Sequence, residues 1–347
     1  ERMRPVARWL SAVSLALAAS VAQAQHGATA PRLDADSAAS AIGAQESRGI
    51  DPAAHGAGGE APGPVDIITP HITDAPHMEV PYWAPPFYKE VHLPHWAPVQ
   101  VGGLSLDLSP TKHVVMMLLA ATLCALTLIT AAAAHRRHSH AVGRPRGFAA
   151  GIEAMVLYLR NEVVLPNVGH HGNAFVPFIL TLFFFILFAN LLGLIPFGST
   201  ATGNISVTGT LAVITFLVVE AAGVRAQGLG YLNTIIYWNK DLPIVMRVLM
   251  AIIMSPVEMV GKITKPFALA IRLFANMTAG HIVVLALIGL FFGFVGTSLT
   301  PGSIVAIAPL LMAVAIMILE LFVAFLQAFI FALLASVFIG QIREAHH

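Results

Sequence analysis

The stretch Ile271-Arg272-Leu273-Phe274-Ala275-Asn276-Met277 places an arginine inside an otherwise apolar helical run. A guanidinium keeps its proton at every physiological pH, so Arg272 does not enter a bilayer by becoming neutral. A charge at the centre of a membrane helix costs at least ~2.5–3.5 kcal/mol, and such residues normally face a water-filled cavity or a partner. Arg272 is therefore either part of an ion pathway or one half of a structural ion pair.

The composition of the chain is that of a polytopic membrane protein. Of its 347 residues, 57% are hydrophobic and only 11% are charged, which excludes a water-soluble globular domain. The net charge of +1 gives no electrostatic reason to expect nucleic acid as a partner. Cys124 is the only cysteine, so an intrachain disulfide and a cysteine-based metal centre are excluded, and we expect neither a metal nor a cofactor.

The first residues have the order of a secretory signal peptide. Arginines come first, an apolar run from Trp9 to Ala22 follows, and small residues end it at Ala22-Gln23-Ala24. We expect residues 1–24 to form a signal peptide that is cleaved after Ala24. An uncleaved anchor is the alternative, although the apolar run is short for about 30 Å of hydrocarbon.

Residues 25–103 are predicted to form an extracytoplasmic arm. From Gln25 to Pro98 the chain is rich in Ala, Gly, Pro, Asp and His, without a sustained helical or strand period. Such a segment has little apolar surface to bury, so we expect it to be mostly disordered. The rest of the chain, residues 104–347, is predicted to be a helical membrane domain.

Five apolar segments are predicted to span the membrane. Their approximate limits are residues 113–134, 175–195, 205–224, 244–295 and 304–340. Residues 148–168 are helical in pattern but too polar to span, which indicates an interfacial helix. The last two spans exceed the bilayer thickness, so we expect them to be tilted and packed as a hairpin. Pro256 and Pro266 indicate bends, or a break, in the fourth span.

Basic residues give the orientation. His135-Arg136-Arg137-His138 follows the first span directly, Arg225 follows the third, and Arg343 ends the last. The positive-inside rule places these ends in the cytoplasm. The sequence thus predicts an all-α membrane protein with an extracytoplasmic amino terminus and a cytoplasmic carboxyl terminus.

Helical spacing groups the polar residues of the last two spans. At 100° per residue, Glu258 and Asn276 each fall within about 40° of the direction of Arg272. Glu320 and Gln327 are separated by about 20° in direction and ~10 Å in rise, so they also share a face. If Gln327 packs at the depth of Arg272, then His281 and Glu320 meet on the outer side and Glu258 remains on the inner side.

This arrangement predicts two half-channels separated by a fixed positive charge. A histidine that titrates near pH 6.5 beside a carboxylate passes protons readily, whereas an arginine does not release one. A static His–Glu pair is the simpler alternative for His281 and Glu320. For Lys262 and Lys265 we expect only a position at the inner interface.

At these residues the sequence resembles the a subunit of F-type ATP synthases. The resemblance is carried by two motifs, Arg272-Leu273-Phe274-Ala275-Asn276-Met277 with Ala279-Gly280, and Leu326-Gln327-Ala328-Phe329-Ile330-Phe331. It extends to Ser109-Pro110-Thr111-Lys112-His113 and to the run from Phe188 to Pro196. It covers the chain from about Leu104 onward.

The resemblance implies a proton-conducting stator subunit in the bilayer. In that family the subunit lies against a rotating ring of c subunits, and its arginine opposes the mid-membrane carboxylate of each. Carried over, Arg272 corresponds to that arginine, Asn276 and Gln327 to its polar neighbours, and Glu258 to an inner-channel carboxylate. The implied partners are the c ring, the b-subunit peripheral stalk and the other synthase subunits, and ATP chemistry belongs to those other subunits.

The chain departs from some members of that family at the outer pair. Those members have an acid after Ala-Gly and a histidine seven residues before the glutamine, whereas this chain has His281 and Glu320. The exchange preserves a His–carboxylate pair.

Two other classes of protein also place ionisable residues at mid-membrane. An ion-coupled secondary transporter would do so, but inverted repeats, its usual mark, are not found. An intramembrane hydrolase would need a nucleophile beside a base, and Ser255 near Glu258 lacks a histidine at helical spacing.

Overall fold

The computed structural model describes residues 74–81, 88–96, 99–101, 104–106, 109–138, 147–169, 172–195, 199–231, 243–297 and 301–344. The predicted signal peptide and most of the predicted arm lie outside these residues.

Five helices of the described chain are long and apolar enough to cross a membrane, which confirms the predicted spans. They are α4 (Lys112–His138), α7 (Val176–Gly193), α8 (Ile205–Gln227), α10 (Ile244–Thr297) and α11 (Pro301–Glu344).

Capping residues set the two ends of α8. The Asn204 side chain accepts a hydrogen bond from the Ser206 amide at 2.9 Å and caps α8, while Gly228 ends it at a φ of 57°.

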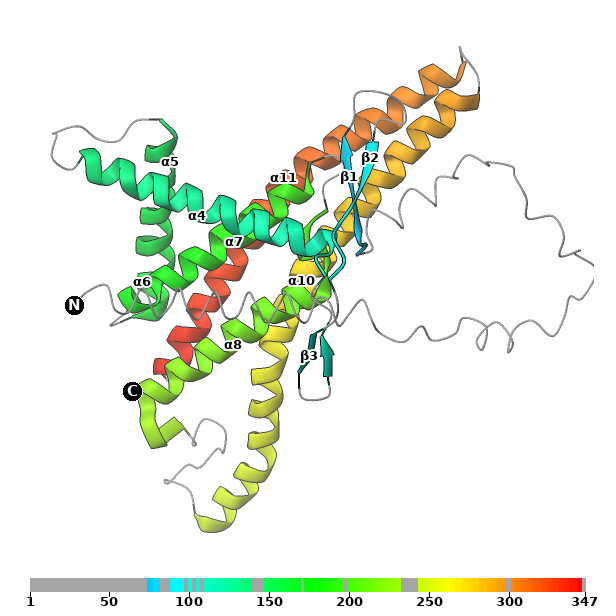
Figure 1. Ribbon diagram of the computed structural model, residues 1–347. Helices are drawn as coiled ribbons and strands as arrows, with labels where there is room; N and C mark the ends of the chain where they lie inside the picture. Colours follow the sequence, from blue (N-terminus) through cyan, green and yellow to red (C-terminus); the bar gives the residue numbers. More distant parts are fainter. Residues whose placement is uncertain are drawn as a thin grey trace, which may run out of the picture.

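The last two helices form the predicted hairpin and extend past the other helices (Figure 1). Helix α10 has 54 residues, or about 80 Å at 1.5 Å per residue. It contains Pro256 and Pro266 yet remains one continuous helix, so the alternative of a broken helix is wrong. Figure 1 shows its axis bending in the first half, where each proline removes one backbone hydrogen bond.

The predicted non-spanning helix is present as three consecutive pieces. These are α5 (Phe148–Tyr158), a π-helical segment η1 (Leu159–Val164) and α6 (Leu165–Val168). Its apolar side buries Ile152, Leu159 and Val163 against the bundle. Its end is tied to α11, because Arg343 donates to the Val168 carbonyl oxygen at 3.2 Å.

Helix α7 is the centre of the core. Most of its side chains are buried, and it packs against α4 and α11. A short helical turn, η3 (Ala201–Gly203), connects the α7 end to α8 and also contacts α10. The ends of α4, α7 and α8 at Lys112, Gly193 and Ile205 therefore define one end of the bundle, here called the Lys112 end. The opposite end carries His138, Gln227 and Glu344 and is called the Gln227 end.

The segment before α4 corrects one expectation. The sequence indicated no strand between Gln25 and Pro98, but β1 (His77–Pro81) and β2 (Tyr88–His92) form an antiparallel hairpin there. A second hairpin joins β3 (Val99–Val101) to β4 (Leu104–Leu106). These strands are too short to produce a periodic pattern. The Lys112 amide donates to the Ala75 carbonyl oxygen at 3.1 Å, so this segment is attached to the membrane domain.

Candidate functional site

Helix α10 separates apolar from polar side chains along its length. Leu269, Leu273 and Met277 repeat every four residues and are buried against the neighbouring helices. Arg272 and Asn276 lie between them in sequence and are exposed. Four residues make slightly more than one turn, so the three apolar side chains lie along one face of α10 and pack against the core. Arg272 is exposed on another side of the helix, and its guanidinium group therefore points away from the core of the subunit.

Arg272 has no protein counter-ion in the part of the chain that the structure describes. No hydrogen bond or ion pair joins it to another described residue, including Asn276 and Gln327. Gln327 lies on α11 and is only 6% exposed. Among the described residues, these three side chains are therefore not joined by a hydrogen bond or an ion pair.

Glu320 lies on α11 and faces α10 where Gly280 leaves room for it. The Glu320 side chain is buried, with 5% exposure. A Cβ at Gly280 would come within 2.6 Å of its Oε1 atom. The half-buried His281 is the next residue of α10. The predicted match in depth between Glu320 and this part of α10 is therefore present, while direct contact between His281 and Glu320 stays a prediction.

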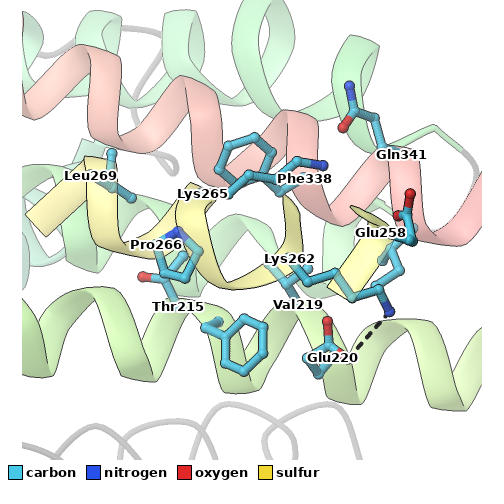
Figure 2. Close-up of a pocket in the computed structure, with 12 residues that line it drawn as sticks. Thr215, Val219, Glu220, Glu258, Lys262, Lys265, Pro266, Leu269, Phe338 and Gln341 are labelled. Atoms are coloured by element: carbon cyan, nitrogen blue, oxygen red, sulfur yellow. Dashed lines mark ion pairs between the residues drawn. The ribbon is translucent and has the colours of Figure 1, made fainter. Parts of the chain in front are cut away.

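A cavity of about 190 Å³ lies near the Gln227 end, between α8, α10 and α11. Figure 2 shows Glu220 on α8 and Glu258 on α10 at this cavity. Lys262 and Lys265 also line it, so both lysines belong to this polar site. Their position at the inner interface stays a prediction.

Lys262 holds one side of this cavity in place. Its Nζ lies 3.7 Å from Oε2 of Glu220 and donates to the Tyr231 hydroxyl at 3.0 Å. It also lies 4.4 Å from the centre of the Tyr231 ring, a cation–π distance. Glu220 and Lys262 are on different helices, so spacing along one helix does not predict this pair.

A hydrogen-bonded network at the Lys112 end was not found from the sequence. Thr200 and Thr202 share a hydrogen bond of 2.7 Å, and the Thr202 hydroxyl donates to Asn190 Oδ1 at 2.7 Å. Asn190 Nδ2 in turn donates to the backbone oxygen of Ala324 on α11 at 3.3 Å. Ala324 lies between Glu320 and Gln327 in the sequence. Uncharged polar residues give little sequence signal, so only their positions in the fold reveal this network.

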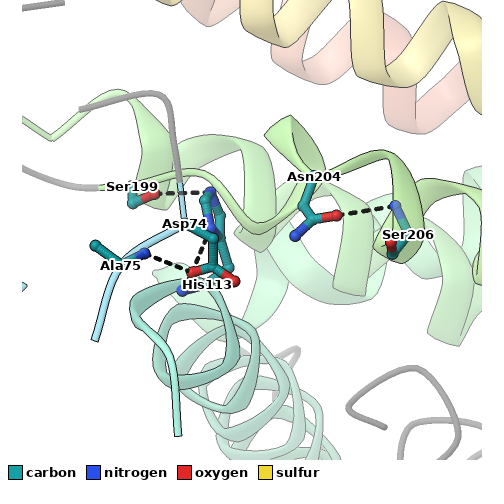
Figure 3. Close-up of polar contacts among 6 residues, drawn as sticks. All are labelled: Asp74, Ala75, His113, Ser199, Asn204 and Ser206. Atoms are coloured by element: carbon teal, nitrogen blue, oxygen red, sulfur yellow. Dashed lines mark hydrogen bonds and ion pairs between the residues drawn. The ribbon is translucent and has the colours of Figure 1, made fainter. Parts of the chain in front are cut away.

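A second unpredicted group joins Asp74, His113 and Ser199 (Figure 3). Nδ1 of His113 lies 2.8 Å from Oδ1 of Asp74, and its Nε2 lies 3.1 Å from the Ser199 hydroxyl. The His113 backbone amide also donates to Asp74 Oδ1 at 3.3 Å. The only sequence signal was His113 at the end of the Ser-Pro-Thr-Lys-His motif, which did not indicate a partner.

The carboxyl group of Asp74 is tuned by this contact. Burial acts to raise the pKa of Asp74, but the ring of His113, the nearby Thr111 side chain and the His113 backbone amide together outweigh it and lower the pKa from its ordinary 3.8. A lowered folded-state pKa stabilises the native structure above the unfolded value, and this stabilisation is lost as the pH falls through the lowered value. At neutral pH the contact between Asp74 and His113 therefore contributes its full stabilisation to the native structure.

No three His, Cys, Asp or Glu side chains gather into a possible metal site within the described ranges. The groups described above are instead two polar regions on either side of Arg272. Gly280, opposite Glu320, follows Arg272 by about 12 Å of helix rise, and Lys262 precedes it by about 15 Å.

The fold and these sites define a polytopic helical membrane protein with ionisable groups placed along its last two helices. The family model described as ATP synthase A chain matches residues 114–340. The chain belongs to this family.

Individual relatives agree over most of the chain. An ATP synthase subunit a 2 of Chlorobaculum tepidum is 43% identical over 282 residues, which cover 80% of this chain and 72% of the relative. An ATP synthase subunit a of Anaeromyxobacter sp. is 39% identical over 97% of this chain and 90% of its own length. The Myxococcus xanthus ATP synthase subunit a is 42% identical over 79% of this chain and 92% of its own.

Proposed function

We propose that this chain is the proton-conducting stator subunit of an F-type ATP synthase. It would assemble with the c-subunit ring, the b-subunit peripheral stalk and the other synthase subunits in the bacterial inner membrane. The chain itself would carry no catalytic site for ATP. The observation that supports this proposal best is Arg272, a permanent charge that is exposed on a spanning helix and has no partner in the described part of the chain.

Such a charge needs a counter-ion outside the subunit. Leaving a guanidinium unpaired at mid-membrane is costly, so a partner protein with a carboxylate at the same depth would stabilise it. A c-ring carboxylate meets this requirement. An ion-coupled transporter that works alone would need to satisfy the charge within its own chain, so the exposed Arg272 favours the stator over the transporter.

The two polar regions are proposed to be the two half-channels. Glu320, with His281, would exchange protons on the outer side, and Glu258 in the cavity would do so on the inner side. Asn276 and Gln327 would line the region around Arg272. The arginine would make the ring carboxylate release its proton on one side, and its fixed charge would block direct passage between the two paths.

The proposed orientation is supported by the positions of the basic residues. The Gln227 end carries Arg225 and Arg343, and the first span ends there at Arg136 and Arg137. The positive-inside rule would put this end in the cytoplasm. The Lys112 end would then face the extracytoplasmic side, and it is called the outer side below.

Arg272→Ala tests the proposal directly. In intact synthase reconstituted into liposomes, we expect this variant to assemble with the ring but to lose ATP synthesis driven by a proton gradient, by at least about a hundredfold. Arg225→Ala is the matched control, because Arg225 is exposed near the end of α8, away from Arg272, and should leave synthesis unchanged. Normal coupled synthesis by the Arg272→Ala enzyme would disprove the stator mechanism.

A further inference from the structure

Buried polar atoms without protein partners are concentrated on one route through the molecule. Within the described residues, six buried side-chain nitrogen or oxygen atoms have no hydrogen-bond partner, and one of these, Oε1 of Gln227, lies at the Gln227 end. The other five are Asp74 Oδ2, Thr111 Oγ1, His113 Nδ1, Thr278 Oγ1 and Glu320 Oε1, and His113 Nδ1 meets Asp74 in an ion-pair contact of 2.8 Å. Buried polar groups are normally satisfied, and where protein does not satisfy them internal water does. The route from Asp74 to Glu320 is therefore suited to hold water.

Hydroxyl groups lie between the outer and inner parts of this route. Ser199, beside His113, directly precedes Thr200, the first member of the Thr200–Thr202–Asn190 network. Thr278 on α10 lies about 4.0 Å from where a Cβ of Gly203 would stand, so it borders the same η3 turn. Gly280 follows Thr278 within the same turn of α10, and the Glu320 side chain of α11 lies against Gly280. A polar track thus runs from the surface of the Lys112 end to the buried carboxyl group of α11.

The outermost members of the track are an acid and an imidazole in direct contact. The Asp74 side chain is 11% exposed and the His113 side chain is 3% exposed, so the carboxyl group lies nearer to water than the ring does. The groups around the ring come from three places: Asp74 from the segment before β1, Thr111 and the buried Lys112 from the α4 start, and Ser199 from the α7–α8 connection.

The same order of groups occurs in Ser–His–Asp hydrolases, but its setting here is different. Ser199 is only 8% exposed, so an acyl substrate has no access to its hydroxyl group. A proton needs no such access, because it travels through hydrogen bonds. The geometry thus favours proton transfer over nucleophilic catalysis.

We propose that Asp74 and His113 form the entrance of the outer half-channel, where they take protons from the aqueous phase and pass them along the hydroxyl-lined track toward Glu320. This inference rests on the proposed stator function and adds the segment before α4 to the conducting path. At each transfer the ring accepts one proton at one nitrogen and releases one from the other. The charge and the atoms therefore balance without another reactant.

Removal of the entrance should make conduction depend on the bulk proton concentration. In Asp74→Asn or His113→Gln synthase, the pair would no longer bind protons at the entrance, so protons would have to enter the track directly from the bulk solution. ATP synthesis should therefore fall on the order of tenfold when the outer compartment is alkaline and its proton concentration is low. Acidifying that compartment should restore the rate. The double variant should be no slower than either single variant, because both residues serve one step.

The measurement is ATP synthesis by purified, reconstituted synthase as a function of the pH of the compartment at the Lys112 end. Rates are divided by the amount of this chain that copurifies with the ring. Asp74→Glu keeps the carboxyl group and should retain most of the activity. His95→Gln is the matched control, since His95 is an exposed histidine close to the same segment and outside the track.

The outcomes are separable. Wild-type rates for both single variants at every pH would overturn the entrance, and so would a loss that is equal at every pH or a loss of assembly, either of which would assign Asp74 and His113 a structural attachment only. If Arg272→Ala in the same liposomes is inactive, these results reject the entrance alone. Coupled synthesis by Arg272→Ala would instead reject the stator function.

Discussion

The two polar regions beside Arg272 differ in chemistry. The region at the Lys112 end consists mainly of neutral amide and hydroxyl groups in short hydrogen bonds, and its carboxyl group, Glu320, is buried. The region at the Gln227 end is a cavity that contains charged lysines and glutamates, with Glu258 exposed. A narrow, ordered path depends on each of its members, whereas a wide cavity lets water replace a lost group. The two regions should therefore respond differently to the same substitution.

The largest effect is expected at Glu320. Glu320→Gln removes the titratable group from the narrow region, and we expect ATP-driven proton pumping in membrane vesicles to fall roughly a hundredfold. Glu162→Gln is the control, because the Glu162 carboxyl group is exposed on η1, and this variant should pump normally.

If Glu320 exchanges protons with His281, then adding Glu320→His to a damaged His281→Glu protein should restore part of the pumping. Strictly additive losses in this double-mutant cycle would count against direct contact.

An intermediate effect is expected at Gly280. An added methyl group in Gly280→Ala would meet the Glu320 carboxyl at 2.6 Å and displace it, because the end of a glutamate side chain moves more easily than the backbone. We expect pumping to fall about tenfold, with overpacking contributing ~1–3 kcal/mol. Gly261→Ala is the matched control on the same helix, since nothing lies within 4 Å of its added Cβ. Equal activity of the two alanine variants would show that the position of Glu320 is not critical.

The smallest effect is expected at Glu258. Its carboxyl group lines a cavity that also contains Glu220 and has room for several waters, so Glu258→Gln should slow pumping only about two- to fivefold. Rates in vesicles at several values of the inner pH measure this effect. A loss as large as that of Glu320→Gln would mean that the inner region is as narrow as the outer one, and the comparison between them would fail.

Local composition and period were enough to predict the helices. Each span is a long apolar run, and the charges of residues 148–168 are sufficient to keep that helix from spanning. The short strands β1 and β2 were missed because five-residue segments carry almost no periodic signal. The continuity of α10 across Pro256 and Pro266 was also undecided, since a proline bends or breaks a helix according to its surroundings.

The candidate site was predictable only in part. Arg272, Asn276, Glu320 and Gln327 were identified as polar residues in apolar helices, and helical spacing gave their relative directions. The partners of Lys262 and His113 were not predictable, because Glu220 and Asp74 are distant in sequence and on separate elements. Spacing along one helix also says nothing about the rotation of its neighbour.

The amino-acid sequence by itself determined that this protein lies in a membrane, roughly which segments form its spanning helices, and that one of them carries a permanent charge. These properties follow from hydrophobic length and from the chemistry of single side chains. Tertiary structure alone decided that Gly280 accommodates Glu320, that α8, α10 and α11 enclose a charged cavity, and that Asp74 reaches His113. The physical reason is that such contacts depend on how helices cross and rotate, and packing of the whole core sets those angles.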